Sequence, residues 1–248
     1  MTSLAASIIL VTVLATSFLS GIFGMAGGVI FMGVLTALVP VATAMIIHGA
    51  VQMVSNGYRA YLWRRHIHWS VFRRYALGSA AAVLLLFALS WRPDKQMVYL
   101  MLGLVTLLAW LPKSIADLDI QKPYQAEGAG FVVQALNTVA GVAGPLMDQF
   151  FVHTDMHRHE IVATKAVTQV LAHFVKIIFW SVPVIMATGA QSLPPAWLIL
   201  AAAPLSMLGT TLGGKVLDRM SDVNFKRGMK YLVTAVGAVM LMRAAGWL

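Results

Sequence analysis

The sequence predicts an all-α polytopic membrane protein with two inverted repeats, each a glycine-broken helical hairpin followed by three membrane-spanning helices. Three observations lead to this prediction. Of the 248 residues 59% are apolar and only 11% are charged, whereas an average soluble domain has about 25% charged residues. The first 58 residues contain no Asp, Glu, Lys or Arg. Long apolar tracts also recur along the whole chain, and two of them are interrupted by similar glycine clusters.

The two glycine clusters, residues 24–28 and 141–145, are expected to break helices. Glycine costs a helix interior roughly 1 kcal/mol relative to alanine, and proline costs about 3 kcal/mol. The apolar arms that follow, 28–39 and 145–152, fall short of the roughly 20 residues that a span requires. We therefore expect each arm to return along its predecessor as a hairpin; a kink or close helix packing is the alternative. The cluster residues expected at a binding site are Gly24, Ala26, Gly27, Gly28, Gly141 and Gly144.

A weak internal repeat with an offset of 117 positions relates the two clusters. The offset pairs Gly24 with Gly141, and the identical pairs that follow it are Ala26/Ala143, Gly27/Gly144, Gln52/Gln169 and Trp63/Trp180. It also pairs His48 with Lys165 and Arg59 with Lys176. Paired breaks in corresponding segments are a sequence pointer to a transporter's binding site. The expected organisation is a first transmembrane repeat at 1–111, a cytoplasmic linker at 112–127 and a second transmembrane repeat at 128–248.

Basic residues orient the two halves. The stretches 64–74 and 215–230 are rich in Lys and Arg, so both are predicted to be cytoplasmic loops, whereas the uncharged 188–195 is predicted to be external. The net charge of +9 is therefore interpreted as a signal of topology, not of nucleic-acid binding. The chain contains no cysteine, which removes thiolate metal sites. We expect a multi-pass protein of the cell (inner) membrane that binds no nucleic acid, no cofactor and no metal.

Two stripes of polar residues are predicted to line a path for an anion. Lys165 lies within an apolar run, where a charge is costly and usually marks a substrate or ion path. Helical spacing places Gln169 and His173 on its face, while His48 shares a face with Gln52 and Asn56 in the first half. Ammonium, imidazole, amides and free helix N–H groups are the donors that an oxyanion needs. Asn137, one turn before the second cluster, is a further candidate, although it would equally serve as a hydrogen bond between helices.

His48 and Asp148 are the candidates for coupling transport to a proton. Imidazole titrates near neutral pH, and Asp148 lies close to the second hairpin tip. Glu160 is expected at a membrane interface, and His153, His157 and His159 are expected in a solvated loop, with a metal site as the alternative.

The chain resembles the sulfite exporter TauE/SafE family. The resemblance rests on the first glycine break, Pro40 after the short arm, and the helix ending Trp63-Arg64-Arg65-His66-Ile67-His68-Trp69. In the second half it rests on the break at 141–145, on Ala163-Thr164, and on Lys176 ahead of an aromatic residue. It covers nearly the whole chain. It implies a membrane carrier, and a probable exporter, of a sulfur-containing anion such as sulfite, thiosulfate or an organosulfonate.

Three functional hypotheses stand at this point. The first is a secondary transporter of a small sulfur-containing anion, working by alternating access with a coupling proton or ion. The second is an intramembrane enzyme, for which Ser55, His48 and His173 are available but no nucleophile motif, metal triad or carboxylate pair is present. The third is an anion channel or an accessory protein. The partners expected under the first hypothesis are the lipid bilayer and a small anion, and the protein is not expected to be an enzyme.

Overall fold

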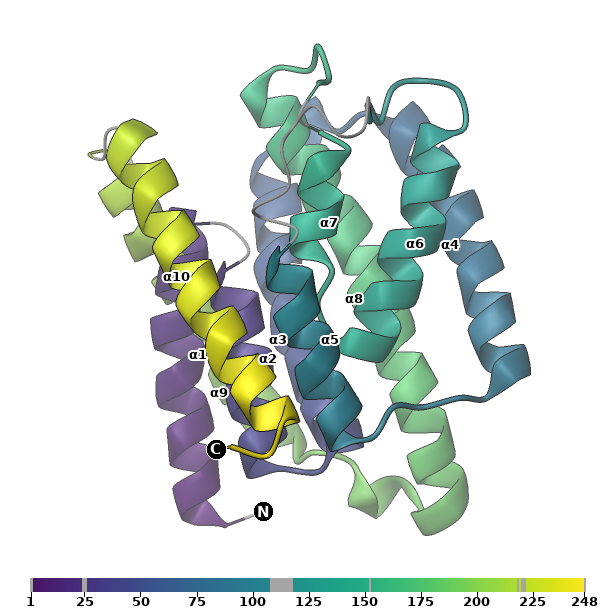
Figure 1. Cartoon of the computed structure of the whole chain (residues 1–248), viewed down its shortest axis with the longest axis vertical. Helices are drawn as coiled ribbons and strands as arrows, with labels where there is room; N and C mark the ends of the chain where they lie inside the picture. Colours follow the sequence, from purple (N-terminus) through teal and green to yellow (C-terminus); the bar gives the residue numbers. More distant parts are fainter. Residues whose placement is uncertain are drawn as a thin grey trace.

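The computed structural model describes residues 2–23, 26–107, 118–151, 153–217, 219 and 222–247 (Figure 1). Within these ranges every regular element is a helix. The α-helices are α1 (Ser3–Phe23), α2 (Ala26–Leu38), α3 (Val41–Leu62), α4 (Trp69–Leu89), α5 (Lys95–Leu107), α6 (Gln125–Ala140), α7 (Gly144–Gln149), α8 (Arg158–Thr188), α9 (Ala196–Leu217) and α10 (Asp222–Ala244). Two short 3₁₀ turns, η1 (Arg64–His66) and η3 (Ala190–Ser192), lie in the connections. The predicted all-α class is confirmed.

Four of these helices, α1, α4, α8 and α9, are long and apolar enough to cross a bilayer. Helix α3 has 22 residues and matches them in length, but it carries His48, Gln52, Asn56 and Arg59, which lower its mean hydropathy. Its polar residues are largely turned toward protein, since His48 and Asn56 are buried. The shorter helices α2 and α5 are apolar as well.

Both short arms turn back along the helix that precedes them. Gly27 in the first turn of α2 lies against the carbonyl of Thr16 and the side chain of Ser20, both on α1. In the second half the amide of Ile120, ahead of α6, donates to the carbonyl of Phe150, just after α7, over 2.8 Å. Figure 1 shows α7 beside α6 with its far end at the level where α6 begins. The break residue Gly24 lies outside the described residues.

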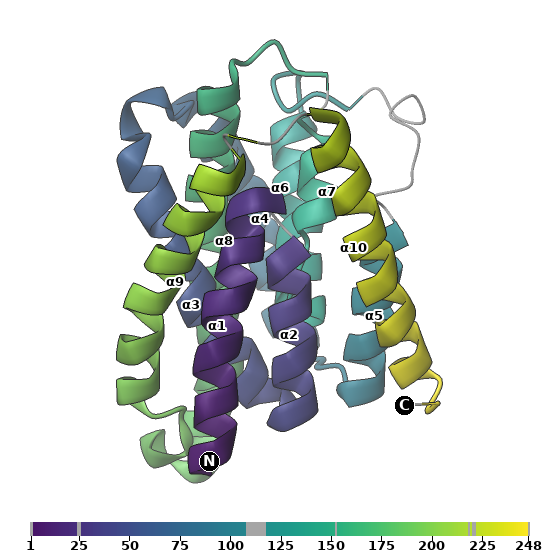
Figure 2. The same ribbon diagram turned by 90° about the vertical axis from the view of Figure 1, so that its left-hand side faces the viewer.

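The helices pack in pairs that join the two halves of the chain. Helix α1 runs along α9 and α4 along α6, while α3 packs on α8 and α5 on α10. Figure 2 shows α1 flanked by α9 and α2. Glycines permit close approach in two of these pairs: Gly209 and Gly213 face the backbone of α1, and Gly78 and Gly130 lie where α4 meets α6. Small residues at helix interfaces are typical of packing inside membranes.

The two predicted basic stretches lie at the same end of the molecule. The α3–α4 connection, with Arg64 and Arg65, lies at the same end as the close of α9 and the start of α10 (Figures 1 and 2). The α8–α9 connection lies at the opposite end, together with both termini. The predicted basic loop at 215–230 is largely helical, because α10 already begins at Asp222. Lysine and arginine are good helix formers, so a run of positive charge does not mark a loop by itself.

The predicted linker 112–127 is described only in part, since residues 108–117 lie outside the described ranges. Its last residue, Glu127, belongs to the first turn of α6 and forms two hydrogen bonds of 2.9 Å with Arg74 of α4. Arg74 also donates to the carbonyl of Lys122 over 2.7 Å. Hydrogen bonding from Arg74 holds the pKa of the Glu127 carboxyl below its usual value. The start of α4 is thereby tied to the segment that leads into the second half.

Candidate anion-binding site

A buried contact between His48 of α3 and Lys176 of α8 is the centre of the candidate site. The lysine Nζ lies 2.8 Å from the histidine Nδ1, and the two residues are 0% and 1% exposed. An ammonium has only donors, so Nδ1 accepts and the other ring nitrogen, Nε2, carries the proton. Nε2 donates to the carbonyl of Gly28 over 3.0 Å. The imidazole therefore bridges the lysine on α8 and the first turn of α2.

Both helix breaks meet at this pair. Gly28 belongs to the arm that follows the first break. Gly141 ends α6 at the second break with φ at +87°, a left-handed conformation that favours glycine, and its carbonyl accepts from Lys176 over 2.8 Å. Irregular backbone at membrane depth is tolerated where it is buried in protein or lines a cavity. One lysine and one histidine therefore join the two hairpins.

Further polar side chains surround the pair with their hydrogen-bonding capacity unused. Asn137, fully buried one turn before Gly141, has no partner in the described chain for either its amide nitrogen or its amide oxygen. The same holds for Nδ1 of His173, whose ring stands edge-on to that of His48 at 5.6 Å between centroids. Buried polar groups normally have partners, so unpartnered ones require an explanation. Asn137 and His173 offer hydrogen bonds to a bound molecule.

Lys176 lacks a carboxylate partner among the described residues. Burying an ammonium without a counter-charge is costly. Two of its three N–H groups serve His48 and Gly141, which leaves one for a ligand. A buried cation with a free donor, beside an unpartnered amide and an imidazole, is chemically suited to hold a small anion.

Lys165, the cation that sequence reasoning puts at the centre with His48, has a different partner. Its Nζ forms an ion pair with Asp148 of α7, and the two side chains are 25% and 36% exposed. Arg59 of α3 lies near enough to act on Lys165 electrostatically. Gln169, one turn further along α8, has an amide nitrogen with no partner in the described ranges. The predicted polar residues thus belong to two separate groups along the α3–α8 contact. His48 and His173 accompany Lys176, and Gln169 accompanies Lys165.

Of the other predicted residues, some lie beside these two centres and some do not. The amide nitrogen of Gln52 lies 2.6 Å from the position that a Cβ on Gly28 would take, so a side chain at Gly28 would displace it. Asn56 donates to the carbonyl of Gln52 over 2.9 Å and accepts from Arg59 over 3.3 Å. Gly27 faces α1 instead of the site. Gly144 is buried at the start of α7, and Ala26 begins α2.

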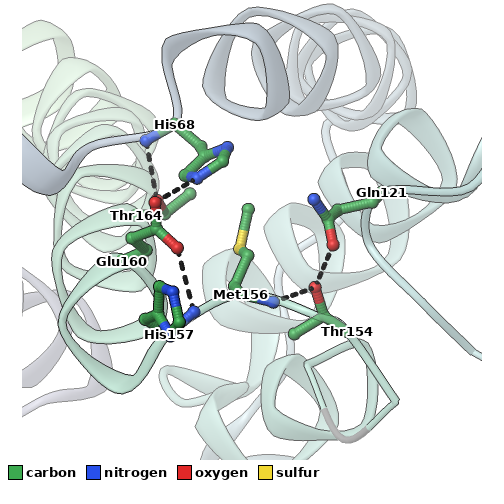
Figure 3. A network of polar contacts seen from close by, with 7 residues as sticks. All are labelled: His68, Gln121, Thr154, Met156, His157, Glu160 and Thr164. Atoms are coloured by element: carbon green, nitrogen blue, oxygen red, sulfur yellow. Dashed lines mark hydrogen bonds and ion pairs between the residues drawn. The ribbon is translucent and has the colours of Figure 1, made fainter.

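The basic end of the molecule carries a network that anchors the start of α8 (Figure 3). Glu160 accepts from the amide of His157 and pairs with the ring of His68, each over 2.9 Å. The amide of His68 donates to the hydroxyl of Thr164 over 3.0 Å. His159 stacks on Trp63 at 4.4 Å between ring centroids. Glu160 therefore joins the α3–α4 connection to α8.

Lys176 and Arg59 are the site residues that sequence reasoning missed as ligands. A helical signal for Lys176 exists, because it lies three residues after His173 and seven after Gln169, on the face already assigned to the site. Arg59 likewise lies three residues after Asn56. The repeat pairs the two residues, and Lys176 also contributes to the family resemblance, but neither pattern marks them as ligands.

A helical membrane bundle with two helix breaks that meet at a buried lysine has the features of a membrane transporter. The comparison with protein families agrees. The chain belongs to the sulfite exporter TauE/SafE family, whose model matches residues 8–240 of the 248, as the resemblance in sequence predicted. Neither the curated proteins nor the solved structures include a match to the chain.

Proposed function

We propose that this protein is a secondary transporter that exports a small sulfur-containing anion, such as sulfite, thiosulfate or an organosulfonate, by alternating access. The anion binds beside Lys176 and His48, with Asn137 and His173 as further hydrogen-bonding groups. The observation that carries the proposal is Lys176, fully buried between two helix breaks without a carboxylate among the described residues. His48, which links that lysine to α2, is the candidate for proton coupling.

The transport cycle that we propose relies on two inverted repeats, 1–111 and 128–248, joined by a cytoplasmic linker. The helix pairings support this organisation, because exchanging α1–α5 for α6–α10 converts the α1–α9 pair into α6–α4. The same exchange swaps the two members of the α3–α8 pair and of the α5–α10 pair, so these two pairs are unchanged. An offset of 117 maps the contact of Phe31 with His48 onto the contact of Asp148 with Lys165. In such folds one repeat moves against the other around a site between them.

We assign the basic end of the molecule to the cytoplasm and the protein to the inner membrane. This orientation rests on Arg64, Arg65 and Lys215, which lie at one end, and on the positive-inside rule. The opposite end, with the 188–195 connection, then faces outward.

Efflux of anions from loaded proteoliposomes tests the function. Purified protein is reconstituted into liposomes that are loaded with sulfite, thiosulfate, sulfate or an alkyl sulfonate. Efflux of the anion is then followed over time at several concentrations. A carrier gives slow, saturable flux that a second substrate anion accelerates from the opposite side. Turnover of the anion without flux would indicate an enzyme, and fast flux without saturation would indicate a channel. Absence of flux and of binding for every anion would refute the proposal.

A further inference from the structure

The ion pair between Lys165 and Asp148 differs in kind from the contact at Lys176. Lys176 is fully buried and has no carboxylate in the described part of the chain. Lys165 has one, supplied by the six-residue helix α7, and both members of the pair are partly exposed. A second cation, Arg59, lies near enough to act on Lys165 electrostatically. The unpartnered amide nitrogen of Gln169 lies one turn away.

The 117-residue offset shows how these groups correspond to the Lys176 site. Lys165 is the counterpart of His48, and Arg59 is the counterpart of Lys176. The contact of His48 with Lys176 thus has its equivalent in the proximity of Lys165 to Arg59. Eleven residues of helix separate His48 from Arg59, which is about 16 Å along α3. The α3–α8 contact therefore carries two repeat-related pairs, His48 with Lys176 and Lys165 with Arg59, one on each side of its middle.

The residue that covers each pair distinguishes them. Phe31 stacks on His48 with 5.6 Å between ring centroids and an angle of 27°. The counterpart of Phe31 is Asp148, which forms the ion pair with Lys165. The His48–Lys176 pair is thus covered by an aromatic ring and keeps an unused donor, while Lys165 is paired with a carboxylate from the protein itself.

We propose that Lys165, Arg59 and Gln169 form a second anion subsite on the basic side of the Lys176 site, and that Asp148 is a tethered carboxylate that occupies it in place of the transported anion. The inference rests on the proposed anion transport and deepens it. An oxyanion can accept the same charge-assisted hydrogen bonds from Lys165 as the carboxylate does, so a free oxyanion at sufficient concentration displaces the carboxylate. A transported anion then passes from one subsite to the other along α3 and α8.

Equilibrium binding of ³⁵S-thiosulfate, and separately of ³⁵S-sulfite, to the full chain in lipid nanodiscs tests the proposal. The variant D148N removes the competing charge and keeps the side chain's size. We expect it to bind a second anion per chain, with at least tenfold higher affinity at that subsite than the wild type. Adding K165M in the D148N background should remove this second binding and leave the first. D148F introduces phenylalanine, the residue found at the corresponding position Phe31, and should bind the second anion as D148N does. This variant serves as the test if D148N fails to fold.

The matched control is E160Q, which removes another carboxylate from the same end of the molecule. Glu160 contacts His68 and His157, not Lys165. The number of anions that E160Q binds per chain should therefore equal that of the wild type. An unchanged stoichiometry and affinity in D148N and D148F would overturn the proposal. So would loss of proton-driven transport in D148N with unchanged binding, which would make Asp148 a proton carrier. The variant K176M tests the central site alone. If K176M loses anion binding while D148N/K176M retains it, the central site is lost and the second subsite remains, so failure of the two sites can be distinguished.

Discussion

Replacing Lys176 by methionine is the most direct test of the central site. The substitution keeps the length and apolar body of the side chain and removes the ammonium that contacts His48 and Gly141. A hydrogen bond to a charged group is worth about 1.5–3 kcal/mol, which corresponds to about a ten- to hundredfold loss of affinity for the anion. We therefore expect K176M to bind the anion weakly and to transport it slowly.

Ligand-induced stabilisation measures this loss without requiring transport. An anion that binds only the folded protein stabilises it by RT ln(1 + [L]/Kd), which is about 2.7 kcal/mol at a hundred times Kd. If Kd rises about thirtyfold, the same concentration gives only about 0.9 kcal/mol. Apparent Tm with and without anion, for wild type and K176M in the same detergent, should differ accordingly. The comparison uses the shift within each variant, because the unpartnered groups left at His48 and Gly141 alter the baseline stability.

A lysine elsewhere provides the control. Lys95 begins α5 and donates to the carbonyl of Ala37 over 3.5 Å, at an exposed position. K95M removes the same charge from the protein, so it should retain the anion-induced shift of the wild type. If K176M kept the full anion-induced Tm shift, the reasoning would be refuted. If K95M lost as much of the shift as K176M, the effect would come from net charge and not from the site.

Three further predictions follow from the fold. Single cysteines at Ser70 and Lys215 should react with an impermeant reagent from the cytoplasmic side, and a cysteine at Ser192 should react from the outside, because these exposed residues lie at opposite ends of the molecule. G27A should lower the apparent Tm by the equivalent of about 1–3 kcal/mol, the usual cost of overpacking, because the new Cβ meets the Thr16 carbonyl. E127Q should destabilise the protein at neutral pH; since the folded pKa of Glu127 is depressed, its contribution is present above the unfolded pKa and is lost as pH falls through the folded value.

Each of these has a control and a contrary outcome. Labelling of Ser70 and Lys215 from opposite sides would end the inverted-repeat organisation. G128A adds a methyl group where nothing lies within 4 Å, so it should leave stability unchanged or slightly higher; equal losses in G27A and G128A would contradict the packing argument. For Glu127, a wild-type advantage over E127Q that persists undiminished at pH 3 would contradict the assigned ionisation.

The class of the protein and the positions of its helix breaks follow from local sequence signals. Apolar tracts give helices, and the glycine clusters end α6 and separate α1 from α2, because helix propensity acts over a few residues. The contact between His48 and Lys176 depends on how two distant helices are aligned, which no local pattern records. The repeat offset identifies corresponding residues, and correspondence in sequence does not require contact in space. His48 and Lys165 are therefore equivalent without being neighbours.

The substitution of Asp148 for Phe31 across the two halves has an energetic meaning for the resting protein. A carrier built from two identical halves would have inward-open and outward-open forms of equal free energy, and both would be equally populated. Under the proposed alternating-access cycle, an aromatic stack in one half and an ion pair in the other contribute to removing that degeneracy, and each 1.4 kcal/mol of difference changes the ratio of the two forms about tenfold. The Phe31/Asp148 difference is thus one of the differences between the halves that would favour one open form of the proposed carrier at rest.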